Sequence, residues 1–186
     1  MDSQTSLSRQ TIFLHWLIAL FMISLLATGL YMEETKSYAL YPLHKSFGVL
    51  LILFVLWRIY WRIKNGWPQP IRLYQPIEQL LSRVVHWLLI IGTILMPISG
   101  MMMSGFGGHG IPLFGLELIA PNPDPNNPKE VIALNETLAS VGHVLHGLGG
   151  KLIIAAVLLH IAGALKHHII DKDNTLKRML GRSALN

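Results

Sequence analysis

The side chains best suited to chemistry in this sequence are its nine histidines, because the chain has no cysteine and few charged residues. Six of them lie inside long apolar stretches: His15, His44, His86, His143, His146 and His160. An ionisable side chain within such a stretch is costly unless it has a partner or a ligand. These histidines are therefore candidate ligands for a metal or a metal-containing cofactor.

Spacing places two of these imidazoles on one helix face. His146 and His160 are fourteen residues apart, which separates them by ~21 Å along a helix and rotates them by only ~40°. His44 lies at the depth of His146, whereas His15 and His86 are both candidates at the depth of His160. Two imidazoles from different helices can bind one iron from both sides, and bundle cores are where such cofactors lie. The pattern predicts two hemes stacked across a membrane.

A zinc or manganese site is the competing use of clustered histidines. Sites of that kind in transporters usually include Asp or Glu, and the apolar stretches contain neither. Zinc held by neutral imidazoles alone would also bring two uncompensated charges into lipid. Heme is therefore favoured, and without a Cys-x-x-Cys-His motif it would be heme b, held non-covalently.

Small residues flank the candidate ligands and allow two interpretations. They are Gly48, Gly142, Gly147, Gly149 and Gly150. They either leave room for a macrocycle or allow helices to pack closely, as small residues do in membranes.

Four apolar helices must position the histidines. The expected spans are about 11–32, 41–61, 84–104 and 141–166, each near the ~20 residues that cross a bilayer core. The whole chain is 52% apolar and 13% charged, with a mean hydropathy of +0.46, whereas a soluble domain has roughly 25% charged residues. These numbers predict an all-α integral membrane protein, a four-transmembrane-helix bundle with residues 1–186 as a single domain.

The positions of lysine and arginine predict the orientation. Eleven of the fifteen lie in or near the two tails and the link between the second and third spans. Both termini are therefore expected in the cytoplasm, with a periplasmic loop at about 105–140 and a cytoplasmic tail at 167–186. The Pro-rich loop is expected to be extended, with one short interfacial helix over 129–140. Since topology explains the positive charge, no nucleic acid is expected as a partner.

Several motifs resemble the bacterial cytochrome b561 family from about residue 11 to residue 179. They are L-H-W at 14–16, H-K-S-F-G at 44–48, H-W at 86–87, H-x13-H at 146–160 and, most specifically, A-L-K-H-H-I-I-D-K-D-N-T-L-K-R-M at 164–179. The resemblance implies a multi-pass protein of the bacterial inner membrane, a diheme b-type cytochrome that exchanges electrons with quinone in a respiratory chain. Members of the family include a superoxide oxidase that reduces ubiquinone.

The resemblance also implies a role for individual histidines. His15 and His160 would be the axial ligands of the cytoplasmic-side heme iron, and His44 and His146 those of the periplasmic-side heme iron.

Three further histidines are interpreted differently. The resemblance implies that His86 and His167 belong to the quinone region and are not ligands. His143 is the main rival of His146, and the spacing of fourteen residues to His160 favours His146. His109 is expected to be an ordinary surface histidine.

Two classes of function remain open at this point. The chain is either a quinone-linked oxidoreductase of the superoxide:ubiquinone type or a non-catalytic electron-transfer subunit that docks a dehydrogenase or hydrogenase partner. The outer loops carry six acidic residues against three lysines, which disfavours simple electrostatic steering of an anion such as superoxide. The expected partners are membrane lipid, ubiquinone and a redox partner protein.

Overall fold

Four long helices dominate the computed structural model, which describes residues 2–3, 6–71 and 74–182. They are α1 (Arg9–Thr35), α2 (Tyr41–Asn65), α3 (Pro76–Phe106) and α4 (Glu136–Ile169). All four are long and apolar enough to cross a membrane. The predicted all-α membrane fold with four spanning helices is therefore confirmed, and each helix extends past at least one end of its predicted span.

Local sequence explains where the helices begin. The side chains of Ser8 and Asn135 cap α1 and α4 by accepting the backbone N–H groups of Thr11 and Leu138, which otherwise have no partner in the first turn. Pro76 occupies the first position of α3, where its missing N–H costs nothing.

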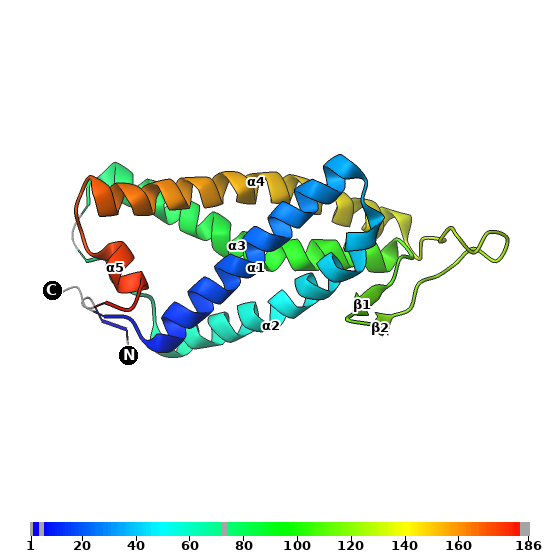
Figure 1. The fold of residues 1–186 in the computed structure, drawn as a ribbon, viewed down its shortest axis with the longest axis horizontal. Coiled ribbons are helices and arrows are strands. Elements are labelled where there is room, and N and C mark those ends of the chain that lie inside the picture. Colours follow the sequence, from blue (N-terminus) through cyan, green and yellow to red (C-terminus); the bar gives the residue numbers. More distant parts are fainter. Residues whose placement is uncertain (1, 4–5, 72–73, 183–186) are drawn as a thin grey trace.

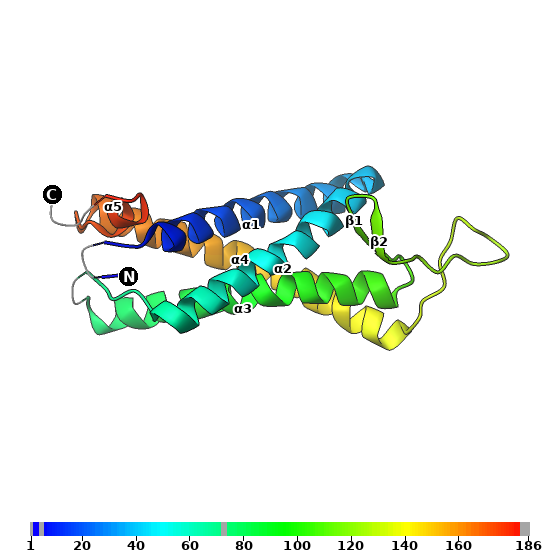
Figure 2. The same ribbon diagram turned by 90° about the horizontal axis from the view of Figure 1, so that it is seen from below.

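The helices run alternately up and down, and α1 crosses the bundle diagonally (Figure 1). The pairs with extended contact are α3–α4, α1–α2 and α2–α3. At mid-height a buried apolar cluster joins three helices: Ile18, Met22, Leu51, Val55 and Ile153. The start of α1 lies at the same end of the bundle as the short helix α5 (Thr175–Met179), as both views show (Figures 1 and 2).

The long loop after α3 forms a small hairpin that the sequence had not indicated. Strands β1 (Ile111–Leu113) and β2 (Leu116–Ile119) pair antiparallel, and positive φ angles at Phe114 and Gly115 form the tight turn that suits a hairpin. The backbone N–H of Phe114 donates to the Ser46 hydroxyl at 3.0 Å. The hairpin is thereby fixed to the start of α2, at the end of the bundle that we call the outer end from the predicted orientation.

The predicted interfacial helix over 129–140 is wrong. Turns and a bridge between Pro123 and Val131 occupy this segment, and α4 begins only at Glu136. The Asn135 cap explains the boundary, because it stabilises a helix that starts at the next residue.

The opposite end, where α1 begins and α5 lies, is called the inner end from the same prediction, and buried arginines hold it together. Arg62 of α2 donates to Asp2 at 2.8 Å, and the two side chains are 9% and 2% exposed. Arg178 of α5 donates to the carbonyls of Ser3 and Gln69. These bonds join the N-terminal segment, the link between α2 and α3, and the C-terminal helix.

Candidate functional site

Two histidines meet near the outer end of the bundle. The rings of His44 on α2 and His146 on α4 lie with their centroids 6.3 Å apart, and both side chains are half-buried. Nδ1 of His44 is 3.2 Å from the Thr28 hydroxyl of α1. Nδ1 of His146 is 3.0 Å from the Met96 carbonyl and 3.2 Å from the Ser99 hydroxyl, so all four helices contribute to this level.

A second group of imidazoles lies near the inner end. The ring of His160 on α4 is 6.1 Å from that of His15 on α1 and 5.3 Å from that of His86 on α3, between centroids. His15 and His160 are half-buried, whereas His86 is exposed. The histidines at this level thus come from three helices.

The distances distinguish the pairs. Imidazole nitrogens bind a transition metal at about 2 Å, so two rings on opposite sides of one metal have centroids about 6 Å apart. The pairs His44–His146 and His15–His160 match this separation, and His86–His160 is shorter. Each matching pair joins α4 to another helix, α2 for His44 and α1 for His15.

The structure divides the glycines near the histidines into those in close helix contact and those that face open space. A Cβ on Gly142 would lie 2.5 Å from the backbone nitrogen of Met103, and one on Gly149 would lie 3.2 Å from Met96 Sδ. These two positions allow close packing of α3 on α4. Gly48 and Gly147 face open space, and a cavity of about 370 Å³ lies between α1 and α2, lined in part by His44.

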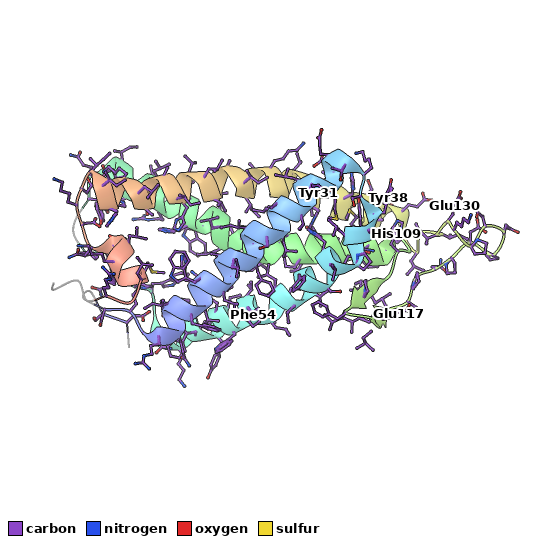
Figure 3. All side chains as sticks on the ribbon, in the orientation of Figure 1. Tyr31, Tyr38, Phe54, His109, Glu117 and Glu130 are labelled. Carbon is purple, nitrogen blue, oxygen red and sulfur yellow. The ribbon has the colours of Figure 1, made fainter. Side chains whose placement is uncertain are left out.

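The remaining histidines lie outside both pairs. His143 is exposed and its Nδ1 contacts Met103 Sδ at 3.3 Å. His109 lies in the outer loop, exposed at the end of the bundle, as expected for a surface histidine (Figure 3). Burial and the nearby Lys45 ammonium lower the pKa of His109 below its ordinary value.

His167 lies in a polar cluster two helical turns beyond His160. Its Nδ1 is 2.7 Å from Asp171 and 3.7 Å from Asp173, and its ring lies 4.5 Å from that of Tyr74. Lys166 bridges Asp171 to Glu78 of α3 at 2.9 and 2.6 Å. The structure therefore brings His86 to the inner histidines but places His167 in a separate, hydrogen-bonded group.

Two comparisons identify the family. A sequence model of the prokaryotic cytochrome b561 family matches residues 6–182. The chain belongs to this family. It is 33% identical over 176 residues to "Cytochrome b561 homolog 2" of Escherichia coli (strain K12), covering 91% of this chain and 88% of that protein.

Two more distant relatives of the cytochrome b561 family also match most of the chain. "Cytochrome b561 homolog 1" of the same organism is 28% identical over 184 residues, covering 94% and 97% of the two chains. "Probable superoxide oxidase CybB" of Yersinia pestis is 28% identical over 171 residues, covering 90% and 91%. The chain is thus a multi-pass membrane electron-transfer protein of the bacterial inner membrane, in a family of b-type heme proteins.

Sequence reasoning missed the residues that hold the outer imidazoles. Thr28 and Ser99 are separated from their histidine partners by 16 and 47 residues. Each is a hydroxyl residue followed directly by glycine, at 28–29 and 99–100, but Ser104–Gly105 shows the same pattern and Ser104 bonds the Gly110 carbonyl instead, so this signal alone would not have found them.

Proposed function

We propose that this cytochrome b561 family protein carries electrons across the membrane through two b-type hemes. His44 and His146 would hold the outer heme, and His15 and His160 the inner one. The supporting observation is that two imidazole pairs, each from two helices, lie 6.3 and 6.1 Å apart at two depths of α4. Heme b supplies a one-electron carrier, and the chain supplies axial ligands, orientation and an apolar surrounding.

The apolar cluster at mid-height supports two separate centres. Ile153 lies midway between His146 and His160 along α4, and it packs with Leu51 and Val55 of α2. This cluster lies between the two histidine levels, and its five residues are apolar, while Lys151 of α4 lies at a similar depth on an exposed face. The cluster would keep the centres apart while leaving them in one bundle.

The inner end is proposed as the ubiquinone side. It carries the two tails and most of the positive charge, which favours the cytoplasm. His86 is exposed beside His160, and His167 lies among carboxylates and a tyrosine hydroxyl. We propose that these two histidines serve the quinone, His86 by contacting it and His167 by passing protons from the cytoplasm, since an imidazole can accept a proton on one ring nitrogen and donate one from the other.

The electron donor is proposed to act on the periplasmic side. Superoxide is the first candidate, supported by the relative named as a superoxide oxidase. The alternative is a docked dehydrogenase or hydrogenase subunit. The two functions differ in whether the purified chain alone, mixed with superoxide and a ubiquinone, reduces the quinone.

The decisive test is the number and type of hemes. The protein purified from membranes should show a b-type reduced-minus-oxidised spectrum, and pyridine hemochrome analysis should give two hemes per chain. One heme per chain would contradict the two-centre proposal. A heme-free protein would contradict heme ligation altogether.

A further inference from the structure

Both outer histidines are bonded through Nδ1 to a neighbouring helix. His44 of α2 meets the Thr28 hydroxyl of α1 at 3.2 Å. His146 of α4 meets the Met96 carbonyl of α3 at 3.0 Å and the Ser99 hydroxyl at 3.2 Å. The inner pair differs, because in the described part of the chain neither His15 nor His160 has a ring nitrogen in a hydrogen bond.

The direction of the bond to His44 follows from the other bonds of Thr28. The Thr28 hydroxyl donates to the carbonyls of Ser24 and Leu25 at 2.9 and 3.1 Å. A hydroxyl has a single proton but two acceptor sites, so with its proton in either carbonyl bond the Thr28 oxygen accepts from His44. In that arrangement Nδ1 of His44 carries the ring proton and the Nε2 lone pair is free.

The same reasoning fixes the tautomer of His146. The Met96 carbonyl can only accept, so Nδ1 of His146 donates to it. The Ser99 hydroxyl donates to the same carbonyl at 3.1 Å and is free to accept from His146 as well. Ser99 is 0% exposed, so this bond is shielded from competing solvent.

A glycine follows each hydroxyl residue, and at position 100 it makes room for the ring. A Cβ on Gly100 would lie 3.0 Å from Cε1 of His146, closer than an ordinary contact, whereas a Cβ on Gly29 would lie 3.6 Å from Cε1 of His44, an ordinary van der Waals distance. A larger side chain at position 100 would therefore push the His146 ring out of place.

We propose that Thr28 and Ser99 are positioning residues for the outer heme. They would hold both imidazoles with Nδ1 protonated and leave Nε2 free to bind iron, which would lower the reduction potential of this centre relative to one whose ligands lack such acceptors. The proposal rests on the heme ligation proposed above.

The sign of the effect on the potential follows from ligand basicity. An acceptor on the outer nitrogen of a metal-bound histidine makes the imidazole a stronger donor. A stronger donor favours ferric over ferrous iron, and removing the acceptor must raise the potential. Thr28 is the only acceptor that the described residues provide for Nδ1 of His44, so its removal has the larger effect.

The experiment is a spectroscopic redox titration of the purified holoprotein and its variants. In Thr28→Val, we expect the potential of one heme to rise by about 59 mV, which is a tenfold change for a one-electron couple. The affected component should be the one lost in His44→Ala. Ser99→Ala should give a smaller rise, since His146 keeps the Met96 carbonyl.

Two controls separate the hydroxyl from general effects of substitution. Thr28→Ser should keep the wild-type potential. Thr93→Val should shift neither heme, because the Thr93 hydroxyl of α3 bonds only the Ile90 carbonyl of its own helix among the described residues.

The outcomes distinguish this inference from the proposed function. Unshifted potentials in Thr28→Val with two hemes bound would overturn the role of Thr28 and leave the diheme proposal intact. If Thr28→Val loses the outer heme and Thr28→Ser retains it, the positioning role of the Thr28 hydroxyl is supported. If both variants lose the outer heme, that role is overturned. If Thr28→Val binds no heme, an unshifted potential in Ser99→Ala overturns the inference and a raised one supports it.

Discussion

Gly142 of α4 lies directly against the backbone of Met103 on α3. A Cβ at position 142 would fall 2.5 Å from the Met103 nitrogen and 2.9 Å from the Ser99 carbonyl. Backbone atoms cannot move aside as a flexible side chain can. This contact fixes the register of α3 on α4 one turn from His146, and with it the bonds between His146 and α3.

Gly142→Ala should therefore destabilise the protein, by about 1–3 kcal/mol as is usual for overpacking. Gly163→Ala on α4 is the matched comparison, because a Cβ at position 163 would meet no atom within 4 Å. Thermal unfolding of the detergent-solubilised variants measures the difference. An equal loss at both positions would contradict the argument from backbone contact.

The outer pair predicts a selective loss of heme. Under the proposed ligation, His44→Ala and His146→Ala should each lose one of the two proposed hemes and keep the other, because each removes a proposed ligand at one level only. His143→Ala is the matched control, and it should bind both hemes since His143 contacts Met103 Sδ. Heme content per chain and the reduced spectrum report the result, and heme loss in His143→Ala alone would reverse the assignment.

At the inner level, geometry predicts which histidine is dispensable for heme. His15→Ala should lose the inner heme, because the His15–His160 separation of 6.1 Å suits binding from opposite sides of a metal. His86→Ala should keep it. Hemochrome analysis of the two variants measures how many hemes each one binds. Heme loss in His86→Ala but not in His15→Ala would make His86 the ligand.

Removing both proposed quinone histidines should slow electron transfer to ubiquinone without changing heme binding. The double variant His86→Ala/His167→Ala should keep both heme spectra, while oxidation of the reduced protein by added ubiquinone slows about a hundredfold, the low end of general acid–base effects of 10²–10⁴. Stopped-flow absorbance measures this rate, with the exposed outer His109→Ala as control. Wild-type kinetics in the double variant would exclude the proposed role.

Asp173 should make the inner end sensitive to acid. Burial raises its pKa, but hydrogen bonds from Tyr74 and Thr175 and the charge of His167 outweigh burial, so the pKa lies below the ordinary value of 3.8. A lowered pKa stabilises the fold above pH 3.8, and this contribution is lost as the pH falls through the folded-state pKa.

Replacing Asp173 by asparagine tests whether this carboxylate makes stability depend on pH. Asp173→Asn should cost about 1.5–3 kcal/mol at neutral pH, as for hydrogen bonds to a charged group, and should flatten the decline in melting temperature below pH 4. Glu117→Gln on exposed β2 (Figure 3) should change neither. A parallel acid decline in wild type and Asp173→Asn would show that Asp173 does not contribute it.

The sequence predicted the four helices because uncharged stretches of this length have few other stable conformations. It also predicted which depths the histidines share, since α4 imposes a regular rise between His146 and His160. It left His15 and His86 unresolved, because depth alone does not give the direction of a side chain. The hairpin after α3 was missed because its turn, Phe114–Gly115, lacks the Asn-Gly or Asp-Gly pair that usually marks such turns.

The fourteen residues of α4 between His146 and His160 span ~21 Å along the helix axis, out of a hydrocarbon core of ~30 Å. An electron passing from one level to the other therefore moves through roughly two-thirds of the transmembrane electric field. One elementary charge crossing the whole field is worth about 2.3 kcal/mol per 100 mV, so this passage is worth roughly 1.5 kcal/mol per 100 mV. Because the cytoplasm is negative, electron flow from the outer to the inner level would work against the membrane potential. Such electron transfer should be slower in an energised membrane and faster after an uncoupler has removed the potential.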